Sequence, residues 1–228
     1  CATASTIWFA TRPAPVPAVS RFVLGLPDSV TLYTGGGTKL ALSRDGSRIV
    51  MVGMKNGKAA LYVRRMDDPV AQLVRGTERA STGTNITPSL SPDGQSVLYE
   101  EDRVLKIIPA VGGTARTLAD KGSSGDIGDR GTLVYTADRG LWLGTSDGHD
   151  GRRIASPDSA HGVYDLLWPE ILPGGNFALV AINRGARVGT LTDSLRLGVV
   201  SLKDGKVTDL ELPGTNPHYV ASGYIVFG

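Results

Sequence analysis

The chain has 228 residues, of which 41% are hydrophobic, and its 24 Lys and Arg nearly balance its 22 Asp and Glu. The basic residues are scattered along the chain, which weighs against a nucleic-acid partner. The one cysteine, Cys1, cannot form an internal disulfide and excludes a zinc site built from several cysteines.

The first twenty residues differ in composition from the rest. They comprise the apolar stub "CATASTIWFA" and a Pro-rich linker that ends near residue 20. Ten residues are too few to span a bilayer, which needs about 20. We favour the end of a membrane helix, with a tether on the N-terminal side. Two other interpretations stay open: Cys1 as the lipid-bearing residue of a bacterial lipoprotein, and an unstructured terminus.

One phrase occurs twice, as "LALSRDGSRIVMV" at 40–52 and as "PSLSPDGQSVLYE" at 88–100. Apolar residues lead into a Ser-x-Asp-Gly phrase, and an apolar run rich in β-branched side chains follows it. This pattern predicts strand, tight turn and strand. Gly tolerates a positive φ and Asp accepts hydrogen bonds from the backbone ahead of it. The predicted turn residues are Ser43, Asp45, Gly46, Ser91, Pro92, Asp93 and Gly94.

Weaker copies of the phrase follow at Gly131, at Pro173-Gly174-Gly175 and at Gly223. The turn glycines are spaced by about 37 to 48 residues, close to the roughly 40 to 50 of a four-stranded propeller blade. With 30 Gly, 13 Pro and no long helical periodicity, the sequence predicts an all-β fold, a β-propeller of four-stranded blades. The predicted units are 33–80, 81–124, 125–160, 161–214 and, in part, 215–228.

The Ser-x-Asp-Gly phrases resemble the repeats of TolB-like propellers. An ordered set of further segments, including "RFVLGLPDSVTL", "RGLWLGTSDGHDG" and "WPEILPGG", is similar to the propeller that follows the membrane helix of bacterial membrane-bound serine/threonine protein kinases. This resemblance covers nearly the whole chain from Arg21 onward. It implies a kinase domain upstream, but the phosphate loop, the His-Arg-Asp loop and the Asp-Phe-Gly motif of kinases do not occur in this sequence.

TolB-like propellers of this kind have six blades, so the resemblance implies that the propeller at 21–228 is incomplete. We expect four full blades and the start of a fifth. The segment 21–27 precedes the first unit and is predicted to be the strand that closes the ring.

Few residues suggest chemistry. Ser146 in "GTSDG" matches the nucleophile phrase of some hydrolases, but it occupies an ordinary turn between strands and no helix follows. The histidines His149, His161 and His218 are far apart, and "DGHDG" has too few oxygen ligands for calcium. Asn85-Ile86-Thr87 matches a glycosylation acceptor by chance. We therefore predict no catalytic, cofactor or metal residues.

Two tryptophans, Trp168 and Trp142, lie in predicted strand segments or next to them. Trp168 and Glu170 are weak candidates for the rim of a pocket, although packing of Trp168 between blades is the simpler interpretation. Trp142 shows the alternation of a half-buried strand residue, and we expect it in the core.

The sequence thus predicts a non-catalytic module, not an enzyme, that binds an unknown protein, peptide or small molecule and needs no cofactor. We expect it on the extracytoplasmic face of a bacterial membrane, tethered, as part of a serine/threonine kinase. Two alternatives remain: the propeller of a prolyl-oligopeptidase-like hydrolase, and a soluble TolB-like periplasmic scaffold.

Overall fold

The computed structural model describes residues 25–33, 39–78, 86–148, 151–185 and 194–228. In these ranges the chain forms β-strands and one short 3-10 turn, η1 (Ser159–His161), so the all-β prediction is confirmed. No helix within these ranges is long and apolar enough to cross a membrane. The apolar stub and linker at 1–20 lie outside the described residues.

The strands group into four sheets and a final hairpin. Blade one contains β1 (Thr31–Leu32), β2 (Leu40–Leu42), β3 (Arg48–Lys55), β4 (Lys58–Arg65) and β5 (Gln72–Leu73). Blade two contains β6 (Ser89–Leu90), β7 (Ser96–Glu101), β8 (Val104–Pro109) and β9 (Arg116–Ala119). Blade three contains β10 (Ser124–Ile127), β11 (Thr132–Ala137), β12 (Gly140–Thr145) and β13 (Arg152–Ala155). Blade four contains β14 (Asp165–Ile171), β15 (Phe177–Asn183), β16 (Leu195–Ser201) and β17 (Val207–Pro213), and the hairpin contains β18 (His218–Val220) and β19 (Tyr224–Val226).

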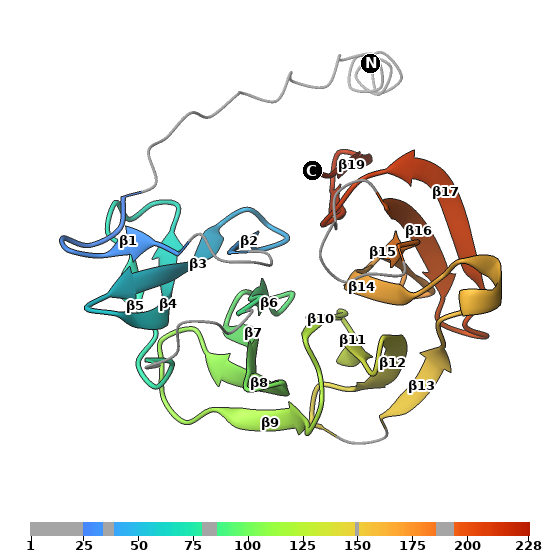
Figure 1. The fold of residues 1–228 in the computed structure, drawn as a ribbon. Helices are drawn as coiled ribbons and strands as arrows, with labels where there is room; N and C mark the ends of the chain where they lie inside the picture. Colours follow the sequence, from blue (N-terminus) through green and yellow to red (C-terminus); the bar gives the residue numbers. More distant parts are fainter. Residues whose placement is uncertain (1–24, 34–38, 79–85, 149–150, 186–193) are drawn as a thin grey trace, which may run out of the picture.

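The sheets fan out around a common centre (Figure 1). Strands β2, β6, β10 and β14 lie innermost, and each later strand of a blade lies farther out. A gap separates blade one from the hairpin. The predicted β-propeller, with four blades and the start of a fifth, is confirmed.

Blade one departs from the simple pattern of four strands. Both β1 and β2 pair with β3, with Thr31 opposite Met54 and Leu40 opposite Met51. Pairing therefore begins two residues before the predicted start of the first unit at residue 33. The predicted ring-closing strand lies partly outside the described residues, and its described part, residues 25–27, is not in a strand.

The core consists of the blade faces packed against one another. One cluster joins Val50 of blade one to Val97 of blade two, and another joins Leu98 to Leu133 of blade three. Radial packing of this kind buries both faces of every inner sheet.

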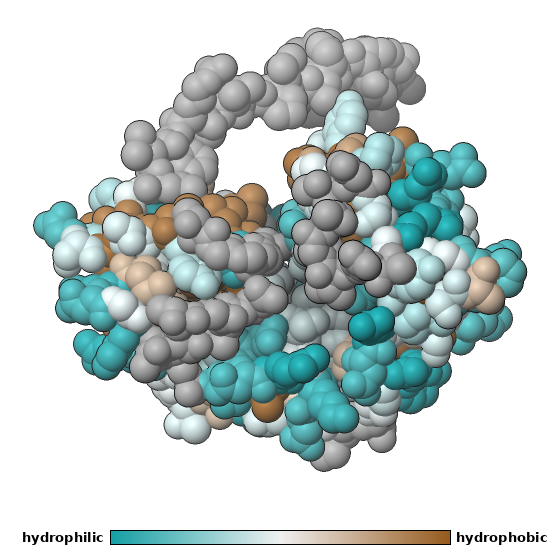
Figure 2. Space-filling model, in the orientation of Figure 1, coloured by the Kyte–Doolittle hydropathy of each residue, from teal (hydrophilic) through white to brown (hydrophobic). Residues whose placement is uncertain are grey.

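The flanks on either side of the gap are the exception. Hydrophobic surface gathers there over blade one and beside β19 (Figure 2). Leu32 is 47% exposed, and Tyr224 in the hairpin is 70% exposed. These flanks therefore leave exposed the kind of apolar surface that the inner blades bury.

Candidate functional site

The predicted turns that end the innermost strands share one backbone geometry. In each, the amide of the turn glycine donates to the carbonyl three residues earlier, at 2.8 to 3.0 Å. The glycines all have positive φ, between 64° and 74°. These four turns all lie on one side of the array, which we call the turn face. They are Ser43–Gly46, Ser91–Gly94, Gly128–Gly131 and Leu172–Gly175.

In blades one and two, the Ser and Asp side chains of the turn form hydrogen bonds with each other and with the backbone of the next strand. Ser91 Oγ donates to Asp93 Oδ1 at 2.6 Å and accepts from the amide of Ser96 at 2.9 Å. Asp93 Oδ1 also accepts from the amide of Gln95 at 3.0 Å. Ser43 and Asp45 make the equivalent bonds. Hydrogen bonds from Ser43 and Ser47 lower the pKa of Asp45 to about 2.

Blades three and four keep the turn but lose this arrangement. Gly128-Asp129-Arg130-Gly131 and Leu172-Pro173-Gly174-Gly175 stand where blade two has Ser-Pro-Asp-Gly. The second position of the turn is Arg44 in blade one and Asp129 in blade three, where blade two has Pro92. Charged side chains at this position are available for contacts beyond their own turn.

The side chain of Arg44, in blade one, contacts blade three. Its Nη1 donates to Asp129 Oδ1 at 2.8 Å, and its Nη2 donates to Asp126 Oδ2 at 3.2 Å. Nη2 also lies 3.3 Å from the carbonyl oxygen of Ile127. Since blade two lies between these blades, the arginine spans the centre of the array on the turn face, and we call this region of contact the mouth.

Asp126 joins a third blade to this contact. It lies on the innermost strand β10, with a side chain only 10% exposed, and its Oδ2 accepts from the amide of Ile171 in blade four at 2.8 Å. Burial raises the pKa of Asp126 to about 6, although Arg44 and the Ile171 amide favour the charged form.

Glu170, in blade four, makes the same kind of contact with the hairpin that Asp126 makes with blade four. It stands directly before the last residue of β14, as Asp126 does in β10. Its carboxylate accepts from Tyr219 N at 2.8 Å and lies 2.6 Å from His218 Nδ1, both in the hairpin. The hydrogen bond with Glu170 raises the pKa of His218, and burial opposes this. Acids at one repeated position therefore hold each of these blades to the next.

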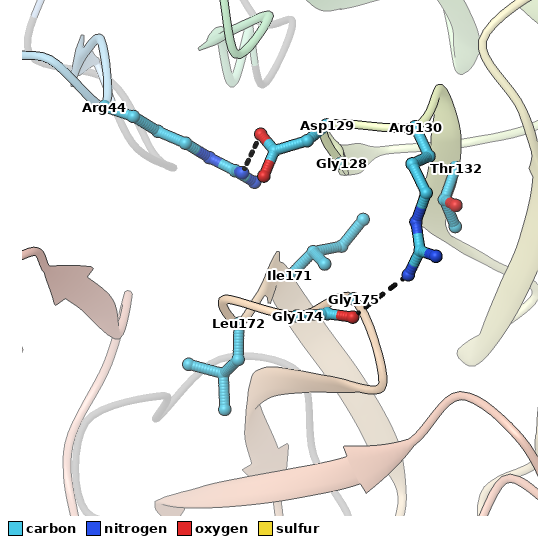
Figure 3. A pocket seen from close by; sticks show the side chains of 9 residues that line it. All are labelled: Arg44, Gly128, Asp129, Arg130, Thr132, Ile171, Leu172, Gly174 and Gly175. Carbon is cyan, nitrogen blue, oxygen red and sulfur yellow. Dashed lines mark hydrogen bonds and ion pairs between the residues drawn. The ribbon is translucent and has the colours of Figure 1, made fainter.

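A small pocket adjoins the Arg44 bridge (Figure 3). Its volume is about 180 Å³. Arg44 and Asp129 lie at one side and Arg130 at the other, where Arg130 Nη2 donates to the carbonyl of Gly174 at 3.2 Å. The lining residues are Arg44, Gly128, Asp129, Arg130, Thr132, Ile171, Leu172, Gly174 and Gly175.

The predicted rim residues Trp168 and Glu170 are not among those that line the pocket. Their neighbours Ile171 and Leu172 supply that wall instead. Trp168 has a φ of 49° and lies in an irregular stretch of β14, where the pairing with β15 shifts between Leu167 and Glu170.

The other candidates stay apart from the mouth. Ser146 lies in the hairpin turn between β12 and β13, where the amide of Gly148 donates to the carbonyl of Thr145 at 3.0 Å. His161, the last residue of η1, pairs with Asp158 at 2.6 Å, whereas His218 pairs with Glu170. His149 and Asn85 lie outside the described residues. Trp142 stacks near Tyr135, with a centroid distance of 6.2 Å, and donates its indole N–H to the carbonyl of Ala137 at 3.0 Å.

A second buried acid lies at the other end of the blades. Glu100, at the far end of β7, is 7% exposed, and its Oε2 has no hydrogen-bond partner within the described ranges. Burial raises the pKa of Glu100 to about 7. Burial also lowers the pKa of Lys39 to about 8, although Glu100 opposes this change, and Lys39 Nζ donates to the carbonyl of Ile86 at 3.0 Å.

No group of three or more His, Cys, Asp or Glu side chains able to hold a metal occurs in the described part of the chain. The mouth offers arginines and carboxylates from blades one and three instead, with backbone and apolar groups from blade four. Such a set suits the binding of charged or polar groups.

The sequence did not single out Arg44, Asp126, Asp129 or Arg130. The available signal was the departure from the repeated phrase itself: a charged residue stands at the second turn position of blades one and three. The partner of each charged side chain depends on how the blades are arranged around the centre, and the local sequence pattern does not determine this arrangement.

No family model and no curated protein sequence matches this chain. Solved structures with the same fold include a TolB-like protein from Agrobacterium tumefaciens, with 18% identity, a TM-score of 0.65, and coverage of 83% of this chain and 74% of that chain. TolB from Acinetobacter baumannii matches with 17% identity and a TM-score of 0.60, over 81% of this chain and 46% of that chain. A chain of a nidogen–laminin complex matches with 11% identity and a TM-score of 0.55, over 83% of this chain and 70% of its own length. The fold is therefore a TolB-like β-propeller.

Proposed function

We propose that this chain is a non-catalytic interaction module that binds its ligand at the mouth on the turn face. The observation that carries this proposal is the Arg44 bridge. Side chains from blades one, three and four converge there on one small pocket, although the local turns do not need them. Propellers serve many unrelated functions, so the fold alone does not indicate what this chain binds, and the residues of this site do.

A ligand screen tests the proposal. The full chain is mixed with a defined library of amino acids, short peptides, nucleotides and monosaccharides, and its melting temperature is recorded. A ligand that binds only the folded state raises this temperature. At least one probe is expected to do so for the wild type, and the effect should be lost in the double variant Arg44→Ala, Asp129→Ala.

The matched control is the double variant Arg65→Ala, Asp67→Ala. It removes another exposed ion pair, with an N–O distance of 2.6 Å, from a place outside the pocket. This control should respond to the probe as the wild type does. A probe that binds both double variants equally well would place the site elsewhere, and cleavage of a library peptide by the wild type would overturn the non-catalytic assignment.

We further propose that the module is the extracytoplasmic part of a membrane-bound serine/threonine kinase, with its tether on the N-terminal side. The ordered segments from Arg21 onward support this proposal, because they resemble the propellers of such kinases. Sequencing of the full-length gene tests it. A kinase domain and a membrane helix encoded upstream are expected.

A soluble TolB-like periplasmic scaffold is the second candidate. The likeness of the fold to two TolB structures favours it. A cleavable signal sequence directly upstream, with no kinase domain, would support the scaffold and refute the kinase assignment.

A further inference from the structure

We propose that the pocket between Arg44 and Arg130 binds a carboxylate group of the ligand, and that Asp129 occupies the carboxylate position on Arg44 until the ligand arrives. This inference rests on the proposed function, because it names the chemical class bound at the same site.

Arg44 is fixed in place independently of Asp129. On its buried side, the guanidinium donates to Asp126 and to the carbonyl of Ile127. Asp126 is itself held by the amide of Ile171. The arginine therefore keeps its position when Asp129 moves away, and a planar guanidinium that is already positioned suits a carboxylate.

Asp129, by contrast, is easily displaced. Its side chain is 71% exposed, whereas that of Arg44 is 36% exposed. Exposed ion pairs of this kind contribute little to stability, and an incoming carboxylate can replace this one at small cost. The contact nevertheless shows that this side of Arg44 can donate to a carboxylate oxygen at 2.8 Å.

The opposite wall of the pocket contains a second arginine. Arg130 points toward the Gly174 turn, where one N–H donates to the carbonyl oxygen (Figure 3). A guanidinium carries five N–H donors, so the single bond to Gly174 leaves capacity for a second acceptor. Ile171 and Thr132 also line the pocket, together with glycines that leave room for a small group.

The charge balance favours a single negative charge. The two arginines are matched by Asp126 and Asp129, so displacement of Asp129 frees one positive charge for the ligand. Asp126 stays buried beside Arg44 and repels a second negative charge. A monoanionic carboxylate therefore fits better than a doubly charged phosphate.

The test is an NMR titration of the full chain with two matched probes, N-acetyl-glutamate N-methylamide and its uncharged glutamine counterpart. Only the glutamate probe is expected to shift the Nε–Hε signals of Arg44 and Arg130, with saturation in the millimolar range. Arg130→Ala should weaken binding about five-fold or more, and Asp129→Asn should strengthen it about three-fold, because the internal competitor loses its charge.

Control variants separate binding from folding. Arg130→Lys keeps the positive charge and should retain part of the affinity, while Arg65→Ala should bind as the wild type does. Equal binding of the two probes, or no shift at about 20 mM of either, overturns the inference. Preferential binding of N-acetyl-lysine N-methylamide would also overturn it and would assign the pocket to cations.

The outcome for the proposed function is read separately. If the library screen finds a ligand that needs Arg44 and Asp129 but carries no carboxylate, the proposed function at the mouth stands and the carboxylate inference fails. If no library member binds at the mouth and the glutamate probe also fails, both fall.

Discussion

The two ends of the blades each bury an acid, and they treat it differently. At the turn face, Asp126 accepts hydrogen bonds from Arg44 and from the amide of Ile171. At the other end, Glu100 has one carboxylate oxygen without a hydrogen-bond partner in the described part of the chain. Burial raises the pKa of both acids, to about 6 for Asp126 and to about 7 for Glu100. The hydrogen bonds of Asp126 join blades one, three and four. Ionised Glu100, by contrast, carries a desolvation cost that its contacts offset less well.

The largest expected loss tests the first half of this comparison. Asp126→Ala should lower the free energy of unfolding by about 2 to 3 kcal/mol, because it leaves the Ile171 amide without its acceptor and Arg44 without its buried partner. Urea unfolding at pH 7 measures the change. Asp126→Asn keeps an acceptor, and its effect should stay below about 1 kcal/mol. An alanine variant as stable as the wild type would contradict the role of Asp126.

At the end of the blades away from the turn face, we expect substitution of the buried acid to increase the free energy of unfolding. The folded state raises the pKa of Glu100 from 4.5 to about 7, so it binds more protons than the unfolded state between these values. The contribution of Glu100 to stability therefore falls as the pH rises through that window. Glu100→Gln should gain on the order of 2 kcal/mol at pH 8 and little at pH 4.

Urea unfolding at both pH values measures this difference. Glu211→Gln, an exposed acid, is the control and should change stability little at either pH. A Glu100→Gln variant that is less stable than the wild type at pH 8 would show that the ionised carboxylate is well compensated.

A smaller and more local effect is expected at the contact between blade four and the hairpin. Glu170→Ala removes the acceptor of the Tyr219 amide and the partner of His218, and should cost about 1 to 2 kcal/mol. The His218 contribution is complete below pH 6.5, its ordinary pKa, and is lost as the pH rises through the higher folded value.

Hydrogen exchange checks this prediction directly. The Tyr219 amide should exchange about ten-fold faster in Glu170→Ala, while amides of β7 and β8 stay unchanged. Asp158→Ala is the matched control, because it breaks an acid–histidine pair of the same 2.6 Å distance on the exposed 3-10 turn. Equal exchange of Tyr219 in the wild type and in Glu170→Ala would refute the contact.

The smallest effect distinguishes two turns of the turn face. Ser91→Ala removes a hydroxyl that donates to Asp93 and accepts from Ser96, and should cost about 1 kcal/mol. Pro173→Ala, in the turn without such bonds, should cost only a few tenths of a kcal/mol through the unfolded state, about 0.5 or less. Thermal unfolding under one condition compares the two. Equal losses would show that the side-chain bonds of blade two add nothing.

The fold was predictable because the signal repeats. A turn glycine with positive φ recurs at each blade, and the apolar strands around it fit only sheets that cover one another. The division into strands followed the same logic. The split inner strand of blade one was missed, because "VTLYTGGGTKLAL" carries no local sign that β1 and β2 pair with the same neighbour.

The candidate site was not predictable in the same way. Arg44 and Asp126 are 82 positions apart and belong to blades that are not neighbours, so their contact depends on the curvature of the whole array. Glu170 was singled out as a rim residue, whereas its carboxylate binds the hairpin. The sequence marks these positions only as departures from a repeat, and the partners follow from three-dimensional packing.

A double-mutant cycle tests most directly whether side chains of blades one and three meet at the mouth. Arg44→Ala, Asp126→Ala and the double variant are compared with the wild type by urea unfolding at pH 7. We expect a coupling free energy of about 1 kcal/mol or more between these positions. Losses that add within about 0.3 kcal/mol would mean that Arg44 and Asp126 do not interact, and the mouth would lose its bridge.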